Sequence, residues 1–196
     1  MSLFRRVLNL DQPASQDLPV DPHAPLPELS KESLPGETES VHMIAAALSG
    51  LPPARARYVA AFAYLLGRAA NANLEVSDAE LTEMEHLGEE AGLDEPTATL
   101  IVNMSAHLSA DFGATEDFLV AREFKAISTM EERLRLIRAC FLVMAADDVI
   151  DASEAHLVNR IAEELDVERA DLNRIRDEFH DRLSSVKAVR EVAQQG

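Results

Sequence analysis

The sequence is poor in cysteine and glycine, and these shortages exclude several classes of protein. A single cysteine, Cys140, rules out an internal disulfide. It lies in the apolar run Ala139–Ala146, which predicts a buried and chemically inert thiol. Only seven glycines occur, runs of β-branched residues are absent, and the strong helix formers Ala, Leu, Glu and Arg dominate. The composition therefore predicts an all-α protein.

Basic residues are also few. The chain has 18 Lys and Arg against 35 Asp and Glu, which gives a formal net charge of -17 at pH 7. Nucleic acids and anionic lipids are bound by clustered Lys and Arg, so neither is an expected ligand. The acidic charge attracts cations and basic proteins instead. A role in solubility alone is the alternative interpretation.

Long apolar segments are missing as well. The longest run, Val59–Gly67, has nine residues and is followed by Arg68. A membrane-spanning helix needs about 20 apolar residues. No apolar stretch of a secretory signal follows the N-terminal residues, so we expect a cytoplasmic protein.

Recognisable catalytic motifs are absent from the sequence. It contains no Gly-rich phosphate loop and no His-Glu-x-x-His motif, and no Cys or Ser nucleophile is recognisably spaced from a histidine. Glu83 and His86 have the Glu-x-x-His spacing of di-iron bundles, but His86 falls outside the apolar stripe of its helix, as expected for a solvated pair. The sequence therefore predicts that the chain is not an enzyme. An enzyme of an unrecognised type is the less favoured alternative.

Prolines divide the chain into segments. Residues 1–10 place five apolar side chains opposite two arginines, which favours weak docking to a membrane surface or to a partner; a frayed end is the alternative. Residues 11–40 hold six of the nine prolines and are predicted to be a flexible linker. Residues 41–183 are predicted to form the helical domain, and residues 184–196 a tail.

Apolar residues at helical spacing predict seven to eight helices in this domain. Ser77 and Asp151 are each followed three residues later by a glutamate, Glu80 and Glu154, which is the pattern of a capping box. Thr129 caps another helix. The expected helices cover about 41–48, 54–70, 77–92, 95–109, 116–126, 130–146, a segment that begins after residue 151, and 168–183.

The domain contains one helix–acidic turn–helix plan twice, and the two copies align at a constant offset. Residues Ala72–Glu80 align without a gap with Ala146–Glu154, and Leu87–Leu93 aligns with Ile161–Val167. Each half has a long apolar helix, a polar turn and a capped second helix, so patterns at several levels agree. Either half alone would leave an apolar face exposed. We therefore predict a tandem repeat packed about a pseudo-twofold axis.

The second copy of the turn carries a family resemblance. Residues Ala146–Glu154 (Ala-Asp-Asp-Val-Ile-Asp-Ala-Ser-Glu) lie between an apolar helix that starts near Met130–Leu134 and the apolar stripe of Leu157–Ala162. This arrangement resembles the TerB family of tellurite resistance proteins, and the turn also resembles a domain of membrane-anchored DnaJ-like co-chaperones. The resemblance covers about residues 41–183. It implies an all-α fold and an association with stress response, tellurite resistance and metal ions.

The acidic turns are candidate metal sites for a divalent cation, Ca²⁺ or Mg²⁺, which take oxygen ligands. The candidate ligands are Asp147, Asp148, Asp151, Glu154, Asn73 and Glu80. Helix capping explains several of the same residues, because Asp and Glu favour a helix N-terminus. Leu74 and Asp148 replace the turn glycine of the family, Asn73 replaces its first Asp, and the spacing of an EF-hand is not met.

Two functions stay open at this point. The favoured one is a non-catalytic acidic helical module of the TerB type, which acts by binding an unidentified protein partner. The alternative is a domain that binds or senses divalent cations through the acidic turns of the two repeats.

Overall fold

The computed structural model describes residues 37–48, 50–73, 76–90, 93–111, 113–146 and 149–183. Within these residues the chain forms eight α-helices and no strand, which confirms the predicted all-α fold. The helices are α2 (Glu39–Ala47), α3 (Pro53–Ala70), α4 (Asp78–Glu90), α5 (Glu95–Asp111), α6 (Gly113–Ile127), α7 (Met130–Met144), α8 (Ala152–Glu164) and α9 (Arg169–Glu178). Two short 3₁₀ turns, η1 (Asn71–Asn73) and η2 (His180–Arg182), follow α3 and α9.

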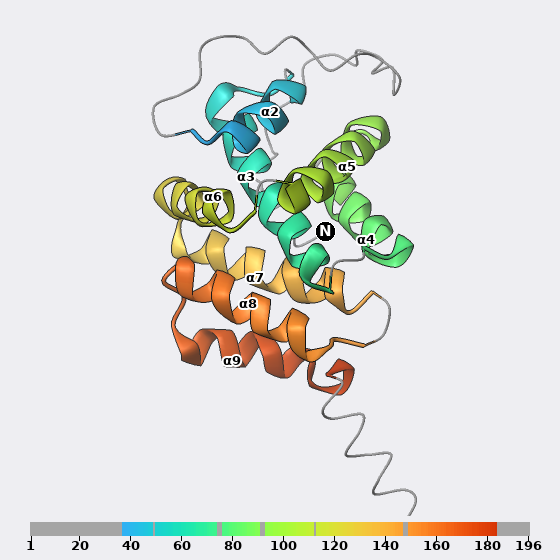
Figure 1. Cartoon of the computed structure of the whole chain (residues 1–196), viewed down its shortest axis with the longest axis vertical. Coiled ribbons are helices and arrows are strands. Elements are labelled where there is room, and N and C mark those ends of the chain that lie inside the picture. The colour runs from blue at the N-terminus through green and yellow to red at the C-terminus, as the bar shows by residue number, and fades with distance from the viewer. Residues whose placement is uncertain are drawn as a thin grey trace, which may run out of the picture.

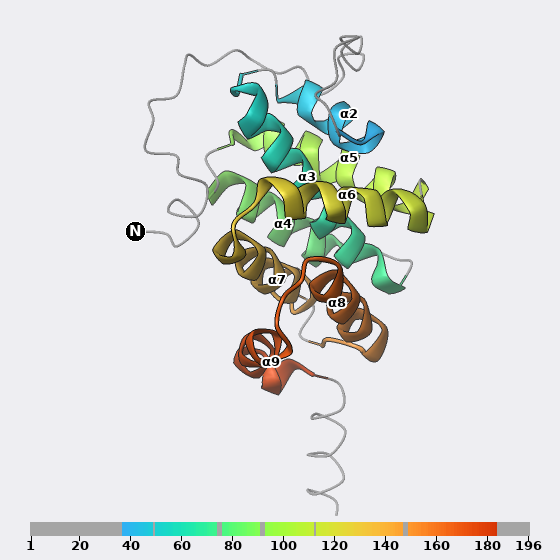
Figure 2. The same ribbon diagram turned by 90° about the vertical axis from the view of Figure 1, so that its left-hand side faces the viewer.

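Helix α3 is the centre of the fold and contacts α2, α5, α6, α7 and α8 (Figures 1 and 2). Fourteen of its eighteen residues are buried. The sequence predicted one apolar stripe for this helix, but the neighbouring helices cover its other faces as well. None of the described helices combines the length and the hydrophobicity that crossing a bilayer requires.

The element boundaries repeat in the way that the sequence alignment of the two halves predicts. The first and last residues of α4 align with those of α8. Helices α3 and α7 end at the aligned residues Ala70 and Met144, and α5 and α9 start at the aligned residues Glu95 and Arg169. The contacts between the halves correspond as well: α3 of the first half contacts α8 of the second, and α4 of the first half contacts α7 of the second. These features agree with a tandem repeat, whereas the pseudo-twofold axis itself stays a prediction.

The third helix of each half packs differently. Helix α5 crosses α3 at Gly67, where an added Cβ would lie 2.6 Å from the backbone carbon and oxygen of Ser105. The residue aligned with Gly67 in the second half is Phe141, which is buried in α7 and stacks on Phe179 with the ring centroids 5.4 Å apart. A glycine lets two backbones approach closely, whereas a phenylalanine keeps the next segment a side chain away. Helix α9 lies at the end of the molecule opposite α2 (Figure 2).

The C-terminal end of α8 is closed by a backbone hydrogen bond and a residue in the left-handed conformation. The N–H of Val167 donates to the carbonyl of Ala162 at 2.9 Å, a bond that reaches back five residues. Asp166 takes a left-handed conformation with a φ of 54°. Its counterpart in the first half is Gly92, at the end of the helix predicted over 77–92, and this glycine lies outside the described residues. Aspartate is one of the few side chains that tolerate this conformation.

The linker ends earlier than the sequence predicted. Helix α2 starts at Glu39, so residues 37–40 belong to the folded domain rather than to the linker assigned to 11–40. The reason is tertiary: the backbone amides of Thr38 and Ser40 donate to carboxylates of α6. The predictions for residues 1–10, for most of the linker and for the tail 184–196 lie outside the described residues.

The last helix is shorter than the one predicted over 168–183. Helix α9 ends at Glu178, and η2 then directs the chain back to the second acidic turn. There the N–H of Ile150 donates to the carbonyl of Arg182 at 2.9 Å, and Ile150 and Leu183 form an isolated parallel bridge. This docking across the domain replaces the final turn of the expected helix.

Candidate functional site

The first acidic turn leads from η1 into α4 and contains the predicted capping box. The Oε2 atom of Glu80 accepts from the N–H of Ser77 at 2.8 Å and lies 3.0 Å from its hydroxyl, and that hydroxyl accepts from the N–H of Glu80 at 3.2 Å. Glu80 is only 1% exposed. The side-chain amide of Asn71 donates to the carbonyls of Gly67 and Ala106, at 3.0 and 2.8 Å, and so connects the end of α3 with α5.

The second acidic turn has an equivalent cap at the start of α8. Asp151 accepts from the N–H of Glu154 at 2.9 Å, and Glu154 accepts from the N–H of Asp151 at 2.6 Å. Glu154 is 2% exposed. The hydroxyl of Ser153, followed by backbone amides, holds the pKa of Asp151 below its usual value. Arg182 donates to the carbonyl of Ala145 at 3.1 Å, which places a cation at the beginning of this turn.

The six predicted metal ligands are only partly described. Three of them take part in helix caps: Glu80, Asp151 and Glu154. Asp147 and Asp148, and the side chain of Asn73, lie outside the described residues. Among the described residues, no group of three or more His, Cys, Asp or Glu is placed to hold a metal ion. The metal assignment therefore stays a prediction.

A buried polar cluster, which the sequence did not predict, joins the two halves through α6. Arg68, from α3, donates Nη1 and Nη2 to the two carboxylate oxygens of Glu164, from α8, at 2.5 and 3.0 Å. Its Nε lies 3.2 Å from Oδ2 of Asp117 in α6, an ion pair without hydrogen-bond geometry. Tyr64 donates its hydroxyl to Oδ1 of Asp117 at 3.0 Å. The Arg68 side chain is 4% exposed, whereas the side chains of Asp117 and Glu164 are 17% and 16% exposed, so the contacts are shielded from water mainly on the arginine side.

Burial and charge compete in this cluster. Burial raises the pKa of Asp117 more than the nearby Arg68 lowers it. For Arg68, burial lowers the pKa, but the hydrogen bond to Glu164 and the charge of Asp117 outweigh it and leave the pKa raised. Burial also raises the pKa of Tyr64. The arginine therefore stays charged and is the cation that stabilises two partly buried carboxylates.

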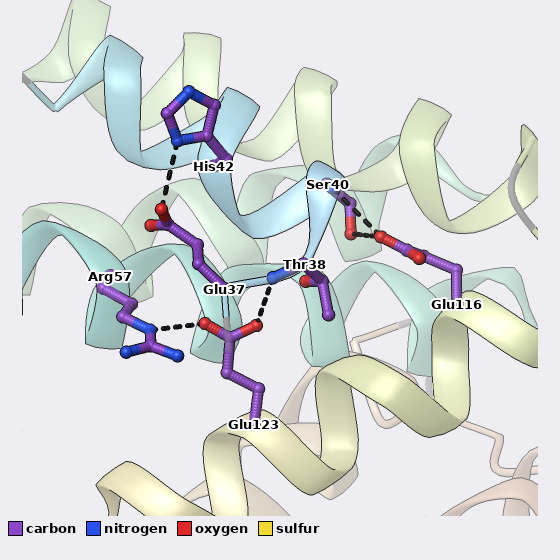
Figure 3. A network of polar contacts seen from close by, with 7 residues as sticks. All are labelled: Glu37, Thr38, Ser40, His42, Arg57, Glu116 and Glu123. Atoms are coloured by element: carbon purple, nitrogen blue, oxygen red, sulfur yellow. Dashed lines mark hydrogen bonds and ion pairs between the residues drawn. The ribbon is translucent and has the colours of Figure 1, made fainter. Parts of the chain in front are cut away.

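Helix α6 also binds the start of α2 and the first part of α3 (Figure 3). Glu123, which is 4% exposed, accepts from the backbone N–H of Thr38 at 2.7 Å and from Nε of Arg57 at 2.5 Å. Nearer the start of α6, Glu116 accepts from the N–H and the hydroxyl of Ser40, at 3.0 and 2.6 Å. Thr38 makes no cap with its own side chain. The carboxylates of α6 therefore supply the N-terminal cap of α2, at the positive end of its helix dipole.

The surface of the first half carries unbalanced acidic charge. Residues 69–121 contain twelve Asp and Glu and neither Lys nor Arg. Six of these acids are exposed or half-exposed on α4 and at the start of α5, and we call them the acidic surface: Asp78, Glu83, Glu85, Glu89, Asp94 and Glu95. None of them forms an ion pair within the described part of the chain. Their charge is therefore open to a partner.

Cys140 and His86 are of residue types that often take part in catalysis. Cys140 is buried, and this burial raises the pKa of its thiol to about 12. A thiol that stays protonated is a poor nucleophile. A cavity of about 40 Å³ between α3, α4 and α5 is lined by apolar residues alone. His86, the histidine with di-iron spacing, is exposed as expected.

Comparison with known proteins identifies the family to which this all-helical chain belongs. A family model described as tellurite resistance protein TerB matches residues 58–177. The chain therefore belongs to the TerB family, which confirms the resemblance found in the sequence. Neither the curated proteins nor the solved structures include one that matches the chain.

Proposed function

We propose that the chain is a non-catalytic helical module of the tellurite-resistance type, which acts by binding a protein partner through the acidic surface. The observation that carries this proposal is the absence of Lys and Arg between residues 69 and 121, together with the exposure of the six carboxylates. Elsewhere in the domain arginines neutralise acids, as in the pairs Arg138–Glu178 and Arg174–Asp171. Carboxylates that form no ion pair within the fold are available to bind a basic protein partner.

The chemistry of the partner follows from that of the surface. A basic protein segment would be drawn to the acidic surface by long-range attraction, which speeds association and weakens with salt. The capping box at Ser77 fixes the start of α4, and the side-chain amide of Asn71 binds the carbonyl of Ala106 in α5, so both helices that carry the acidic surface are held in place. The lack of a titratable group in the cavity between α3, α4 and α5 supports a role that involves no catalysis.

Co-purification with two matched variants tests this proposal. The triple variant Glu89→Gln, Asp94→Asn and Glu95→Gln removes three exposed charges from the acidic surface. The control variant Glu39→Gln, Glu168→Gln and Asp177→Asn removes three exposed charges elsewhere. We expect a protein that co-purifies with the wild type and the control but not with the first variant. Equal recovery with all three proteins would reject the acidic surface as the binding site.

A second candidate function is binding of a divalent cation at the turns. It is favoured by the burial of Glu80 and Glu154, since each uses Oε2 in its capping box and is held at the edge of a turn rich in acids. Calorimetric titration with Ca²⁺ or Mg²⁺ of the wild type and of Asp147→Ala tests it. Saturable heat that the variant loses would support a site in the second turn, and no heat in either protein would reject it. Docking through residues 1–10 and a cytoplasmic location remain predictions.

A further inference from the structure

The second half contains a groove of a character unlike the rest of the molecule. It lies between α8 and α9, and its volume is about 420 Å³. The apolar residues Ala162, Val167 and Leu172 line part of it. Its polar lining includes Arg160, Arg169, Arg176 and His156, against a single acid, Glu163. Three guanidinium groups around one groove are unexpected in a protein whose net charge is -17.

Two of the three arginines have no bonded partner in the part of the chain that the structure describes. Arg160 and Arg169 form no hydrogen bond or ion pair with any described residue, although Arg160 acts electrostatically on Asp117. Arg176, in contrast, is held in place: its Nη1 donates to Asn173 at 2.9 Å, and its Nη2 donates to Asn159. Both are neutral acceptors, so the charge of Arg176 is also uncompensated. The groove therefore combines one positioned guanidinium with two that are free to turn towards a ligand.

The arginines of the neighbouring groove show the contrast. That groove lies between α7 and α9, on the other side of α9, and contains Arg135, Arg138 and Arg174. Each of these arginines has an acidic partner: Arg135 pairs with Glu131, Arg138 with Glu178, and Arg174 with Asp171. Uncompensated positive charge is thus a property of the groove between α8 and α9 and not of every arginine in this half.

The start of α9 has backbone amides that its N-cap side chain leaves unbonded. Its N-cap residue, Glu168, makes no side-chain hydrogen bond to the helix, whereas α4, α7 and α8 all have reciprocal caps. The residues on either side of it, Val167 and Arg169, both line the groove. The first amides of an uncapped helix and its dipole favour an anion at this end.

The first half lacks this chemistry at the equivalent positions. The residue aligned with Arg169 is Glu95, and the residue aligned with Arg176 is Val102. The position that corresponds to Asn159 is Glu85. The basic groove is therefore not imposed by the repeated fold. It belongs to the second half alone.

We propose that the groove between α8 and α9 binds a small phosphorylated molecule, with its phosphomonoester group on Arg160, Arg169 and Arg176. Guanidinium groups match the oxygens of a phosphate in a bidentate manner. The acidic charge of the whole molecule disfavours a long polyanion, while a compact anion inside the groove stays beside the arginines. The apolar lining, with Ala162, Val167 and Leu172, would contact the organic part of the molecule.

Calorimetric titration of the full chain at pH 7 and low salt tests this assignment. The probes are phenyl phosphate and inorganic phosphate, and the proteins are the wild type, Arg160→Gln/Arg169→Gln, and the control Arg174→Gln. We expect saturable binding of phenyl phosphate that is at least about tenfold weaker in the double variant, because two charged hydrogen-bond donors are lost. Arg174→Gln, on the opposite side of α9, should bind within about twofold of the wild type. Inorganic phosphate should bind more weakly than phenyl phosphate.

Several results would overturn the proposal. These are no saturable binding of phenyl phosphate to the wild type, unchanged binding in the double variant, or an equal loss in Arg174→Gln. Equal affinity for the two probes would contradict the contact with the apolar lining. Tighter binding of a phosphoserine peptide than of phenyl phosphate would contradict a small molecule as the ligand. The three arginines that are changed lie on the surface, and circular dichroism of each variant checks that the fold is kept.

Discussion

At the scale of single residues, Arg68 is the side chain on which the interior depends most. It lies on the central helix and is the cation between Asp117 and Glu164, which come from two other helices. A buried ion pair adds little net stability, but removing one partner leaves an uncompensated charge in the interior. The role of this arginine is therefore to permit two carboxylates where the halves meet.

Replacing Arg68 by Met should lower the free energy of unfolding at pH 7 by about 3 kcal/mol. Without the arginine, burial holds the pKa of Asp117 still further above its value in the unfolded chain. The cost of ionising Asp117 is then present at neutral pH and is relieved as the pH falls through that raised pKa. Urea unfolding at pH 7 and pH 5 should show a smaller loss at pH 5.

The matched control for this substitution is Arg138→Met. Arg138 pairs with Glu178 at 2.6 Å, but the two side chains are 34% and 43% exposed. An exposed ion pair contributes below about 1 kcal/mol, so this variant should stay close to the wild type. An equal loss in both variants would contradict the structural role assigned to Arg68.

The cap at Asp151 should give a measurable dependence of stability on pH. The lowered pKa of this carboxyl means that its contribution is present above the unfolded value of about 3.9 and is lost as the pH falls through the folded value. Asp151→Ala should cost about 1 kcal/mol. Asp151→Ser keeps a capping oxygen without the charge, so the advantage of the wild type over it should shrink between pH 5 and pH 3. A difference in urea unfolding that does not change with pH would refute this.

At the scale of elements, the crossing of α3 and α5 depends on Gly67. Gly67→Ala would place a methyl group 2.6 Å from backbone atoms of Ser105, and backbone cannot move aside as a flexible side chain does. The gain in helix propensity is about 1 kcal/mol, whereas overpacking costs about 1–3 kcal/mol and more when backbone must shift. We expect a net loss of stability in thermal or urea unfolding.

Gly50→Ala is the control for the crossing of α3 and α5. No heavy atom lies within 4 Å of a Cβ added there. This variant should be neutral or more stable by up to about 1 kcal/mol, because alanine restricts the unfolded chain. If Gly67→Ala is as stable as Gly50→Ala, α5 does not approach α3 as closely as described.

The attachment of α2 to α6 should be separable from global stability. Glu123→Gln removes the charge that binds Arg57 and weakens the acceptor for the amide of Thr38. Hydrogen exchange of the α2 amides should then become faster while that of α8 stays near the wild type, because α2 opens locally. Glu131→Gln, in an exposed pair with Arg135, is the control and should leave both helices unchanged. Equal acceleration in α2 and α8 would contradict a local role.

The sequence predicted those parts of the elements that are encoded locally. Three helix starts are fixed by caps that lie within four consecutive residues: the boxes at Ser77–Glu80 and Asp151–Glu154, and the cap at Thr129. The local sequence was therefore sufficient to predict where these helices begin. The start of α2 was missed because its caps come from Glu116 and Glu123, which are distant in the sequence. No local pattern could reveal such partners.

The candidate site was predictable to a smaller extent. The capping boxes of Glu80 and Glu154 were predicted from their spacing, and the structure shows in addition that both glutamates are buried. The Arg68 cluster was missed, although a charged residue directly after the apolar run Val59–Gly67 was a signal that could have indicated a buried ion pair. Its partners depend on which helices meet in space, and the spacing within one helix does not encode that.

At the scale of the whole molecule, charge is distributed unequally between the halves. The first half presents the acidic surface on α4 and α5, and the second half holds the groove between α8 and α9. The helix boundaries and caps of the two halves correspond, although their third helices, α5 and α9, pack differently. The halves also differ in the charge of the side chains that face solvent.

The most direct test of the proposed function is the dissociation constant of the complex with the co-purified partner, measured at low and at high salt. For the wild type we expect the constant to rise steeply with salt, because exposed charges are screened beyond about 10 Å at 0.1 M. The triple variant at Glu89, Asp94 and Glu95 should bind more weakly at low salt and respond less to added salt. The same dissociation constants and the same salt dependence in both proteins would contradict the claim that the acidic surface is where this protein acts.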